Sequence, residues 1–332
     1  MIAMRALDQP WELGGLTIPN RVVLAPLAGI GNWFVRLQAK RYGAGLAVSE
    51  MVSSHAIHYG NRKTFDELLV VRPEEKAGGP VAIQLFGGDP DIMREAAARA
   101  ADAGADAIDI NMGCPVPKVT RTGAGVALLS DPARAVAVAR AAGEGSGLPV
   151  FVKLRAGRRI GQSEGFDLAL RLADEAGVAA ISFHPRSAQV RHKGRPDYEL
   201  AAQLAAALPV PVILSGGMND AAHIEQVFEQ TGVAAIMLAR GCLGNPWLFE
   251  QALGRRDDEP EREEILDELE WVIARCIEHL GEQRAGRYLK KFYPWYVAKL
   301  GEGSATQDAL QRAESIFEQR EMVDRLRALQ PA

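Results

Sequence analysis

Residues 107–118 read AIDINMGCPVPK, and the architecture can be worked out from this stretch. The apolar run 107–110 predicts a buried strand, which ends at Asn111 because Gly113 and two prolines force a loop. The loop carries one cysteine, Cys114, at its apex. A strand that ends in a polar residue and then presents a thiol is typical of the functional rim of a parallel barrel. The alternative is a simple turn that contains a cysteine.

The same pattern recurs along the chain. Seven further apolar segments of strand length are expected at 21–27, 46–51, 81–86, 150–154, 180–184, 212–215 and 234–239. Helical segments separate them at 33–42, 91–103, 132–142, 166–176, 199–207 and 221–230. Eight strands that alternate with helices predict the α/β class and a closed (β/α)8 TIM barrel rather than an open sheet.

Composition narrows the class of protein. The 332 residues are 48% hydrophobic and 24% charged, which is typical of a globular protein with a full core. No apolar run is long enough to span a membrane and residues 1–10 lack a signal-peptide pattern, so we expect a cytoplasmic protein without membrane contact. We also expect it to act as a monomer. Three dispersed cysteines argue against disulfides and against a zinc site, and we expect no metal. The net charge of −4 argues against a protein that coats nucleic acid over its whole surface, but it allows a local basic patch.

The chain changes character after Leu248. Residues 255–270 are acidic and predicted to be helical, so we expect a barrel domain at 1–250 and an all-helical domain at 260–328. Within the second domain, residues 284–300 (RAGRYLKKFYPWYVAKL) carry five basic and no acidic residues, interleaved with aromatic ones. This segment predicts an RNA-binding surface. The alternative is a helix whose aromatic residues are buried and whose basic residues face solvent.

The predicted strands end in polar or glycine-rich positions. These ends are Pro26, Glu50, Gln84, Asn111, Lys153 with Arg155, His184, Ser215-Gly216-Gly217 and Ala239-Arg240-Gly241. In a parallel barrel the carboxyl ends of all strands share one rim. Burying each polar group there without a partner would cost a few kcal/mol, so the pattern predicts a binding site.

The side chains at this rim suggest the ligand. Lys153 ends a buried strand and needs an anionic partner, either a reduced flavin or a substrate carboxylate, with an ion pair to Glu50 or Asp109 as the alternative. Gln84 and Asn111 offer amide groups that suit the edge of a flat heterocycle. His184 is expected to donate a hydrogen bond to the same ligand.

Glycines at the last two strand ends have two interpretations. Gly216, Gly217 and Gly241 stand where barrels commonly bind phosphate through backbone N–H groups, and Arg240 could add a charged hydrogen bond. Tight strand-to-helix turns need glycine as well, so the glycines alone leave both interpretations open.

The motifs as a set resemble the tRNA-dihydrouridine synthases, in particular the bacterial B type. The motifs that carry the resemblance are APLAG at 25–29, QLFG at 84–87, NMGCP at 111–115, KLR at 153–155 and RGCLGNPWLF at 240–249. The resemblance covers about residues 11 to 300. It implies a flavin-binding barrel, a helical domain that helps hold RNA, and FMN-dependent reduction of uridine in tRNA with NADPH as hydride donor.

The resemblance also implies roles for individual residues. Cys114 would be the catalytic acid that protonates uracil C5 after hydride addition at C6, and Lys153 would stabilise negative charge on the flavin. The expected FMN contacts are Pro26, Leu27, Ala28, Gln84, Asn111, Lys153, His184, Ser215, Gly216, Gly217, Ala239 and Arg240. The expected substrate contacts are Arg155, Arg186, Arg287, Lys290 and Lys291.

The chemistry is consistent with these roles. A cysteine thiol is mostly protonated near neutral pH and is a far stronger acid than a serine hydroxyl. The sequence departs from the family at Ile30-Gly31-Asn32, at His184-Pro185, at Ser215-Gly216-Gly217 and at Gly157-Arg158. These departures affect the substrate side, so an unusual tRNA position or another structured RNA, such as ribosomal RNA, stays open. The runner-up is a flavin enzyme that reduces a small pyrimidine or enone, and a third alternative is an RNA-binding module without catalysis.

Overall fold

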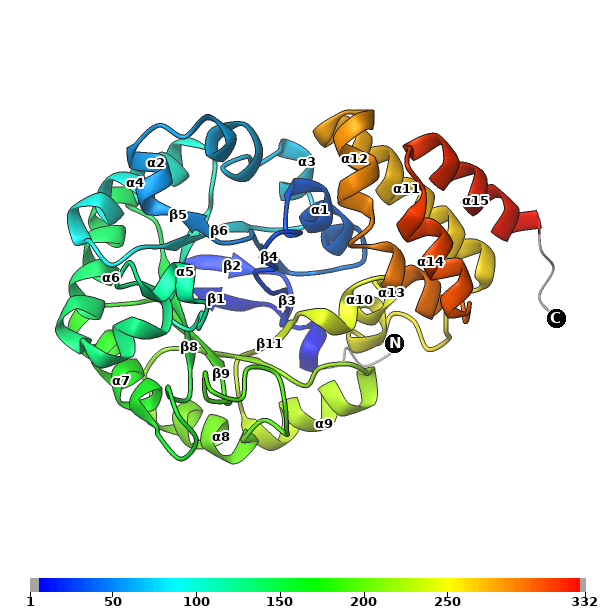
Figure 1. Ribbon diagram of the computed structural model, residues 1–332. Helices are drawn as coiled ribbons and strands as arrows, with labels where there is room; N and C mark the ends of the chain where they lie inside the picture. The colour runs from blue at the N-terminus through cyan, green and yellow to red at the C-terminus, as the bar shows by residue number, and fades with distance from the viewer. Residues whose placement is uncertain (1–5, 329–332) are drawn as a thin grey trace.

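The computed structural model describes residues 6–328 and shows a closed barrel with a group of helices against one side of it (Figure 1). Eight parallel strands form the barrel wall. They are β3 (Val22–Leu24), β4 (Leu46–Val48), β6 (Val81–Phe86), β7 (Ala107–Asn111), β8 (Val150–Arg155), β9 (Ala180–His184), β10 (Val212–Ser215) and β11 (Ala235–Leu238). The predicted TIM barrel is confirmed.

Strand pairing closes the sheet. Neighbours in the chain pair in parallel from β6 to β11, β11 then pairs with β3, β3 with β4, and β4 returns to β6. A short strand, β5 (Val52–Ser53), continues along β6 beyond β4. The predicted strands 21–27 and 46–51 are therefore too long at their carboxyl ends, where the chain already leaves the ladder toward the rim.

Helices cover the outside of the barrel. They include α1 (Trp33–Arg41), α4 (Pro90–Asp102), α6 (Pro132–Ser146), α7 (Glu164–Ala176), α8 (Tyr198–Ala207) and α9 (Ala221–Thr231). Asp89 caps α4 by accepting hydrogen bonds from two backbone N–H groups of the first turn, ahead of Pro90. Gly177 and Gly232 end α7 and α9 in the left-handed conformation that favours glycine. Shorter helical segments are α2 (Ser54–His58), η2 (Thr64–Leu68), α3 (Pro73–Lys76), α5 (Pro117–Thr120), η3 (Gly125–Ser130), η4 (Arg240–Cys242) and α10 (Trp247–Ala252), with η1 (Ala6–Asp8) near the start.

An antiparallel hairpin closes the amino-terminal end of the barrel. Its strands are β1 (Trp11–Leu13) and β2 (Leu16–Ile18), and Figure 1 shows them at the centre of the ring. Trp11, Leu13 and Ile18 are buried against a layer of inward-facing residues that includes Phe151 and Ile213. This apolar plug leaves only the carboxyl ends of the strands open, which is the end where the polar residues were predicted.

Five helices follow the barrel: α11 (Arg262–Leu280), α12 (Glu282–Leu289), α13 (Tyr293–Lys299), α14 (Ser304–Arg312) and α15 (Ile316–Ala328). The expected helix at 255–270 begins only at Arg262, because Pro260 precedes it and residues 255–261 form a connection. No helix within residues 6–328 is long and apolar enough to cross a bilayer.

The helical part is fixed to the barrel through α1. Glu268 is 3% exposed and accepts hydrogen bonds from Gln38 at 2.8 Å and from the Tyr42 hydroxyl at 2.8 Å. Gln38 also donates to the Tyr296 hydroxyl at 2.9 Å. A buried carboxylate needs such partners, so these bonds fix the orientation of α11 against the barrel.

Candidate active site

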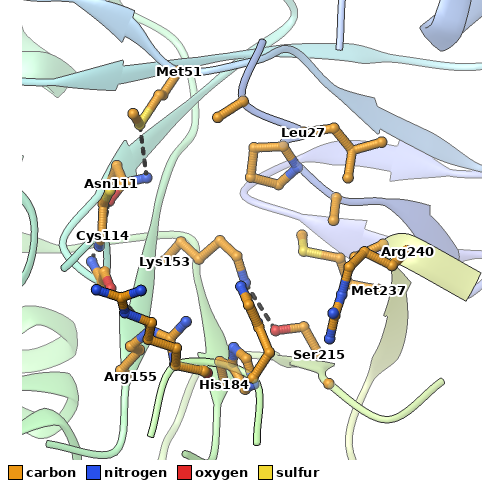
Figure 2. A pocket seen from close by; sticks show the side chains of 18 of the residues that line it. Leu27, Met51, Asn111, Cys114, Lys153, Arg155, His184, Ser215, Met237 and Arg240 are labelled. Carbon is orange, nitrogen blue, oxygen red and sulfur yellow. Dashed lines mark hydrogen bonds between the residues drawn. The ribbon is translucent and has the colours of Figure 1, made fainter. Parts of the chain in front are cut away.

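The rim residues surround one cavity of about 890 Å³ at the carboxyl ends of the strands. Figure 2 shows the cavity with side chains from several barrel strands turned into it. Sixteen of the predicted site residues line it: Pro26, Leu27, Ala28, Gln84, Asn111, Cys114, Lys153, Arg155, His184, Arg186, Ser215, Gly216, Gly217, Ala239, Arg240 and Lys291. Arg287 and Lys290 are outside it.

The alternation of the strands explains this convergence. Phe151 of β8 faces the hydrophobic plug inside the barrel, so Lys153, two residues further on, also faces inward. The same period of two turns Gln84, Asp109 and Asn111 into the barrel above the apolar layer. The interior is thus apolar at the plugged end and polar at the open end.

Lys153 crosses the floor of the cavity to β10. Its Nζ donates to Ser215 Oγ at 2.8 Å (Figure 2). In the part of the chain that the structure describes, no ion pair joins Lys153 to Glu50 or Asp109, which were its predicted alternative partners. Burial lowers the pKa of Lys153, whereas the negative charge of Asp109 raises it. An anion bound in this cavity would therefore stabilise the charged lysine.

Asn111 holds the loop that carries Cys114. Its Oδ1 accepts from the backbone N–H groups of Cys114 at 2.9 Å and Gly113 at 3.2 Å. Its Nδ2 donates to Gln84 Oε1 at 2.9 Å. Cys114 is partly exposed, while Cys242 and Cys276 are buried. Cys114, which lines the cavity, is therefore the one accessible thiol of the three.

His184 and Arg186 form a second group at the mouth. Arg186 donates to the Gly194 carbonyl at 2.6 Å, and its NH1 lies 3.2 Å from His184 Nε2. An arginine N–H can only donate, so Nε2 accepts and the ring proton is assigned to Nδ1. Burial, followed by the nearby cations, lowers the pKa of His184 far below its usual value. The ring is neutral near neutral pH and can donate only through Nδ1.

Arg155 ties two loops together beneath the mouth. Its Nε donates to the Gly113 carbonyl at 3.0 Å, and its NH1 donates to the carbonyls of Arg191 at 2.8 Å and Ser187 at 3.3 Å. The residue is 6% exposed, and burial lowers its pKa to about 10. Two of its three nitrogens are thus bound within the protein, and its predicted contact with substrate stays a prediction.

The glycines after β10 allow other side chains to approach. Gly216 and Gly217 have φ of 109° and 86°, in the region that favours glycine. A Cβ atom on Gly216 would lie 2.8 Å from the His184 ring, and one on Gly217 would lie 2.3 Å from the Tyr198 hydroxyl. The tight-turn interpretation therefore accounts for both glycines, and the phosphate interpretation remains compatible because both line the cavity.

The helical part contributes directly to the mouth. Lys291 and Trp295 line the cavity, and Lys291 Nζ donates to the Gly29 carbonyl at 2.9 Å. At the same residue, the Gly29 N–H donates to Glu50 at 2.8 Å. Burial raises the pKa of Glu50, and the hydrogen bond from Gly29 opposes the shift. The mouth is therefore built by the barrel and the helices together.

Most aromatic residues of the basic segment 284–300 serve packing. Phe292, Tyr293 and Tyr296 are at most 2% exposed, and Phe292 packs 6.0 Å from Phe34 of α1. For these three residues the alternative interpretation, burial with solvated basic neighbours, is correct. Arg287 and Lys291 are exposed, so the basic side of the segment remains available at the surface.

Several cavity residues were not predicted from the sequence. Met237 lines the cavity from β11, and the alternation along that strand could have identified it. Arg191 and His192 come from the loop after β9, and His192 stacks on His184 with ring centroids 6.2 Å apart. Loop residues carry no periodic signal, so nothing in the sequence placed these two at the mouth.

Comparison with known proteins identifies close relatives of the chain. The family model for dihydrouridine synthase matches residues 23–331. A protein named tRNA-dihydrouridine synthase B from Pseudomonas aeruginosa is 35% identical over 297 residues, which cover 87% of each chain. The protein of the same name from Xanthomonas campestris is 33% identical over 311 residues, which cover 92% of each chain.

Solved structures show the same architecture at lower identity. A morphinone reductase mutant matches with a TM-score of 0.52 and 19% identity, over 78% of this chain and 94% of that one. A histamine dehydrogenase from a Rhizobium species matches with a TM-score of 0.59 and 13% identity, over 76% of this chain and 48% of that one. These likenesses support the fold.

Proposed function

The chain belongs to the dihydrouridine synthase family, and from that premise we propose that it reduces the C5=C6 bond of a uridine in tRNA to 5,6-dihydrouridine. The proposed cofactor is FMN and the proposed hydride donor is NADPH. One observation carries the proposal: Cys114 and Lys153 line the same cavity, which is of a size typical of cofactor sites.

The chemistry of the cavity fits a flavin. Gln84 and Asn111 line the cavity in place for the edge of a flat heterocycle, the second Nε2 hydrogen of Gln84 is left to donate to it, and Lys153 supplies a positive charge beside it. The backbone at Gly216 and Gly217, together with Arg240, suits a phosphate. The remaining proposed contacts are Pro26, Leu27, Ala28, His184, Ser215 and Ala239. FMN held by these residues would supply hydride chemistry, with NADPH as the source of the hydride and C6 of the uracil as its acceptor.

Cys114 completes the reaction from the protein side. Hydride addition at C6 leaves an electron pair at C5, and the Cys114 thiol donates the proton that forms the new C5–H bond. The C5=C6 double bond becomes a single bond, and NADPH is oxidised to NADP⁺. The bonds from the loop to Asn111 Oδ1 hold this thiol at the mouth, where a base extruded from RNA can enter.

We place the RNA across the mouth and the helical part. Lys291 lines the cavity and also belongs to the helical part. Arg287 in α12 and Lys290 at the end of α12 add two further basic residues beside it. Arg155 and Arg186 lie deeper, at the cavity wall, where they would contact the inserted nucleotide. Contacts with a phosphate backbone weaken with salt, which gives the surface a measurable signature.

The test begins with the visible spectrum of the purified protein and then measures NADPH oxidation with and without unmodified bulk tRNA. We expect a flavin spectrum and tRNA-dependent dihydrouridine formation. Cys114→Ala should retain FMN and lose uridine reduction, whereas Cys276→Ala, which changes a buried thiol in α11, should retain both. A flavin protein that reduces ribosomal RNA, a free pyrimidine or an enone instead would establish the alternatives. A colourless protein that cannot take up FMN would refute the proposal.

A further inference from the structure

A buried carboxyl group that none of the proposed roles uses lies inside the barrel. Asp109 is 0% exposed and stands on β7, in register with Gln84 of β6. Its Oδ2 accepts a hydrogen bond from Gln84 Nε2 at 2.6 Å. Its Oδ1 has no hydrogen-bond partner within residues 6–328. Burying a carboxyl group in this way is costly, so its presence calls for a physical reason.

Asp109 begins a chain of hydrogen bonds that ends on the Cys114 loop. Gln84 donates to Asp109 and accepts from Asn111 Nδ2 at 2.9 Å, and Asn111 then accepts from the backbone N–H of Cys114 at 2.9 Å. We call Asp109, Gln84 and Asn111 the amide relay. The second hydrogen of Asn111 Nδ2 is directed at Met51 Sδ, 3.7 Å away.

The direction of this relay depends on its first member. A side-chain amide can present either its oxygen or its nitrogen, but an ionised carboxylate can only accept. With a carboxylate at position 109, Gln84 must present Nε2 to it and Oε1 to Asn111. Asn111 must then present Nδ2 to Gln84, which leaves Oδ1 for the loop. If either amide were reversed, two like groups would face each other at one of these contacts.

A simpler role, as the counter-charge of Lys153, does not describe the contacts. Lys153 Nζ donates to Ser215, and no ion pair between Lys153 and Asp109 is found among the described residues. Burial raises the pKa of Asp109, and the hydrogen bond from Gln84 and the charge of Lys153 oppose that shift. The observed contact, in which Gln84 Nε2 donates to Oδ2, suits the ionised form, and the direction of the relay is fixed while the carboxyl is ionised. Within residues 6–328, the hydrogen bond from Gln84 is thus the only one that the Asp109 side chain makes.

We propose that Asp109 is a positioning residue that sets the direction of the amide relay and thereby holds the Cys114 loop in its reactive place. The proposal rests on the proposed function for the role of Cys114. It adds a residue that does not touch the substrate and acts through Gln84 and Asn111. If the proposal holds, the position of Cys114 depends on whether the side chain at position 109 accepts or donates the hydrogen bond to residue 84. It does not depend on the volume of that side chain.

The test is a swap of the carboxylate along the relay. Asp109→Asn keeps the shape but permits both directions. The double variant Asp109→Asn with Gln84→Glu restores a single direction, because the new amide at position 109 donates to the new carboxylate at position 84, which accepts from Asn111. Gln84→Glu alone places two carboxyl groups in contact and should disturb the relay.

The measurement is the rate at which iodoacetamide alkylates Cys114, followed by mass spectrometry on the purified protein without RNA. Cys242 and Cys276 are buried, so the reaction reports the accessible thiol. Loss of one directed hydrogen bond corresponds to about a tenfold change, so we expect Asp109→Asn to react about tenfold faster than the wild type. The double variant should return to within about twofold of the wild type. Asp106→Asn, which removes a carboxylate just ahead of β7, should not change the rate.

The outcomes separate this inference from the proposed function. An unchanged rate in Asp109→Asn, or a double variant that reacts as fast as the more reactive single variant, would overturn the relay. If Asp109→Asn does not fold, Gln84→Glu and the double variant carry the same comparison, and failure of the second change to slow alkylation would overturn it. Full uridine reduction by Cys114→Ala would refute the acid role and leave the alkylation result intact.

Discussion

Replacing Arg155 by methionine should release the loops around the cavity. Arg155 is 6% exposed, and it donates to the carbonyls of Gly113, Ser187 and Arg191, which belong to the loops after β7 and β9. Methionine preserves most of the aliphatic packing but none of the donors. The change therefore isolates the contribution of the guanidinium group to the loops.

The expected decrease in the free energy of unfolding can be worked out from these contacts. Three hydrogen bonds from a charged donor contribute about 1.5–3 kcal/mol each, or about 5–9 kcal/mol together. Burial of the cation opposes them, because it lowers the pKa of Arg155 to about 10. That shift corresponds to about 3 kcal/mol. We therefore expect Arg155→Met to lower the free energy of unfolding by about 2–6 kcal/mol.

Urea denaturation of the two proteins measures this difference directly. Arg158→Met is the matched control, because the Arg158 side chain is 46% exposed and pairs only with Glu164 at the surface among the residues that the structure describes. We expect the control to stay within about 0.5 kcal/mol of the wild type. The loop 185–197 should also become sensitive to limited proteolysis in Arg155→Met. A loss below about 1 kcal/mol with an equally resistant loop would refute the reasoning.

Three further predictions follow from other contacts. Arg36→Met leaves Glu75 buried without its partner at 2.6 Å and should cost about 3–5 kcal/mol of unfolding free energy, whereas adding Glu75→Leu should recover part of the loss; no recovery would contradict this. Because burial lowers the pKa of His184, the unfolded chain binds the proton first as pH falls, so His184 costs up to about 2 kcal/mol of stability between about pH 6.5 and 5. His184→Asn should flatten that part of the stability profile, and an equal slope would count against it. Lys291→Met should change the free energy of unfolding by less than about 0.5 kcal/mol. It should reduce the slope of log K for RNA binding against log salt concentration by about one, and an unchanged slope would exclude a phosphate contact.

The barrel was predictable because its strands have a strict period and clear ends. The predicted ranges of β6, β9 and β10 coincide with the structure, since each is a largely apolar run bounded by a polar or glycine residue. Each of these strands carries a polar side chain at or near its carboxyl end. All three of these side chains line the cavity, namely Gln84, His184 and Ser215. One physical rule, that parallel strands end at a common rim, was enough to bring them together.

The hairpin that closes the barrel was missed for a physical reason. Strands β1 and β2 have three residues each, which is too short for a periodic pattern to emerge. Their role depends on Trp11 entering the barrel and donating to the Asn20 carbonyl at 3.0 Å. Such a contact is set by tertiary structure, and no local signal in the sequence encodes it.

The basic segment shows how composition can mislead about the role of single residues. Tyr293 and Tyr296 were counted with the basic residues as one surface, yet Tyr293 donates to Gln319 at 2.8 Å inside the helical part. Because a helix turns every 3.6 residues, aromatic and basic residues that are close in sequence can face opposite sides. Only the exposed side, which includes Lys291, is open to the proposed contact with RNA.

The two ends of the barrel interior have opposite effects on the stability of the fold. At the plugged end Phe151 and Ile213 pack against the hairpin and stabilise the fold through apolar burial. At the open end burial shifts the pKa of Asp109 upward and those of Lys153 and His184 downward, so each of these groups weakens the fold when it is charged. The same eight strands carry both layers. A ligand whose charge is opposite to that of one of these groups would offset part of the free energy that burial of the charge costs. Binding of such a ligand would therefore stabilise the folded barrel.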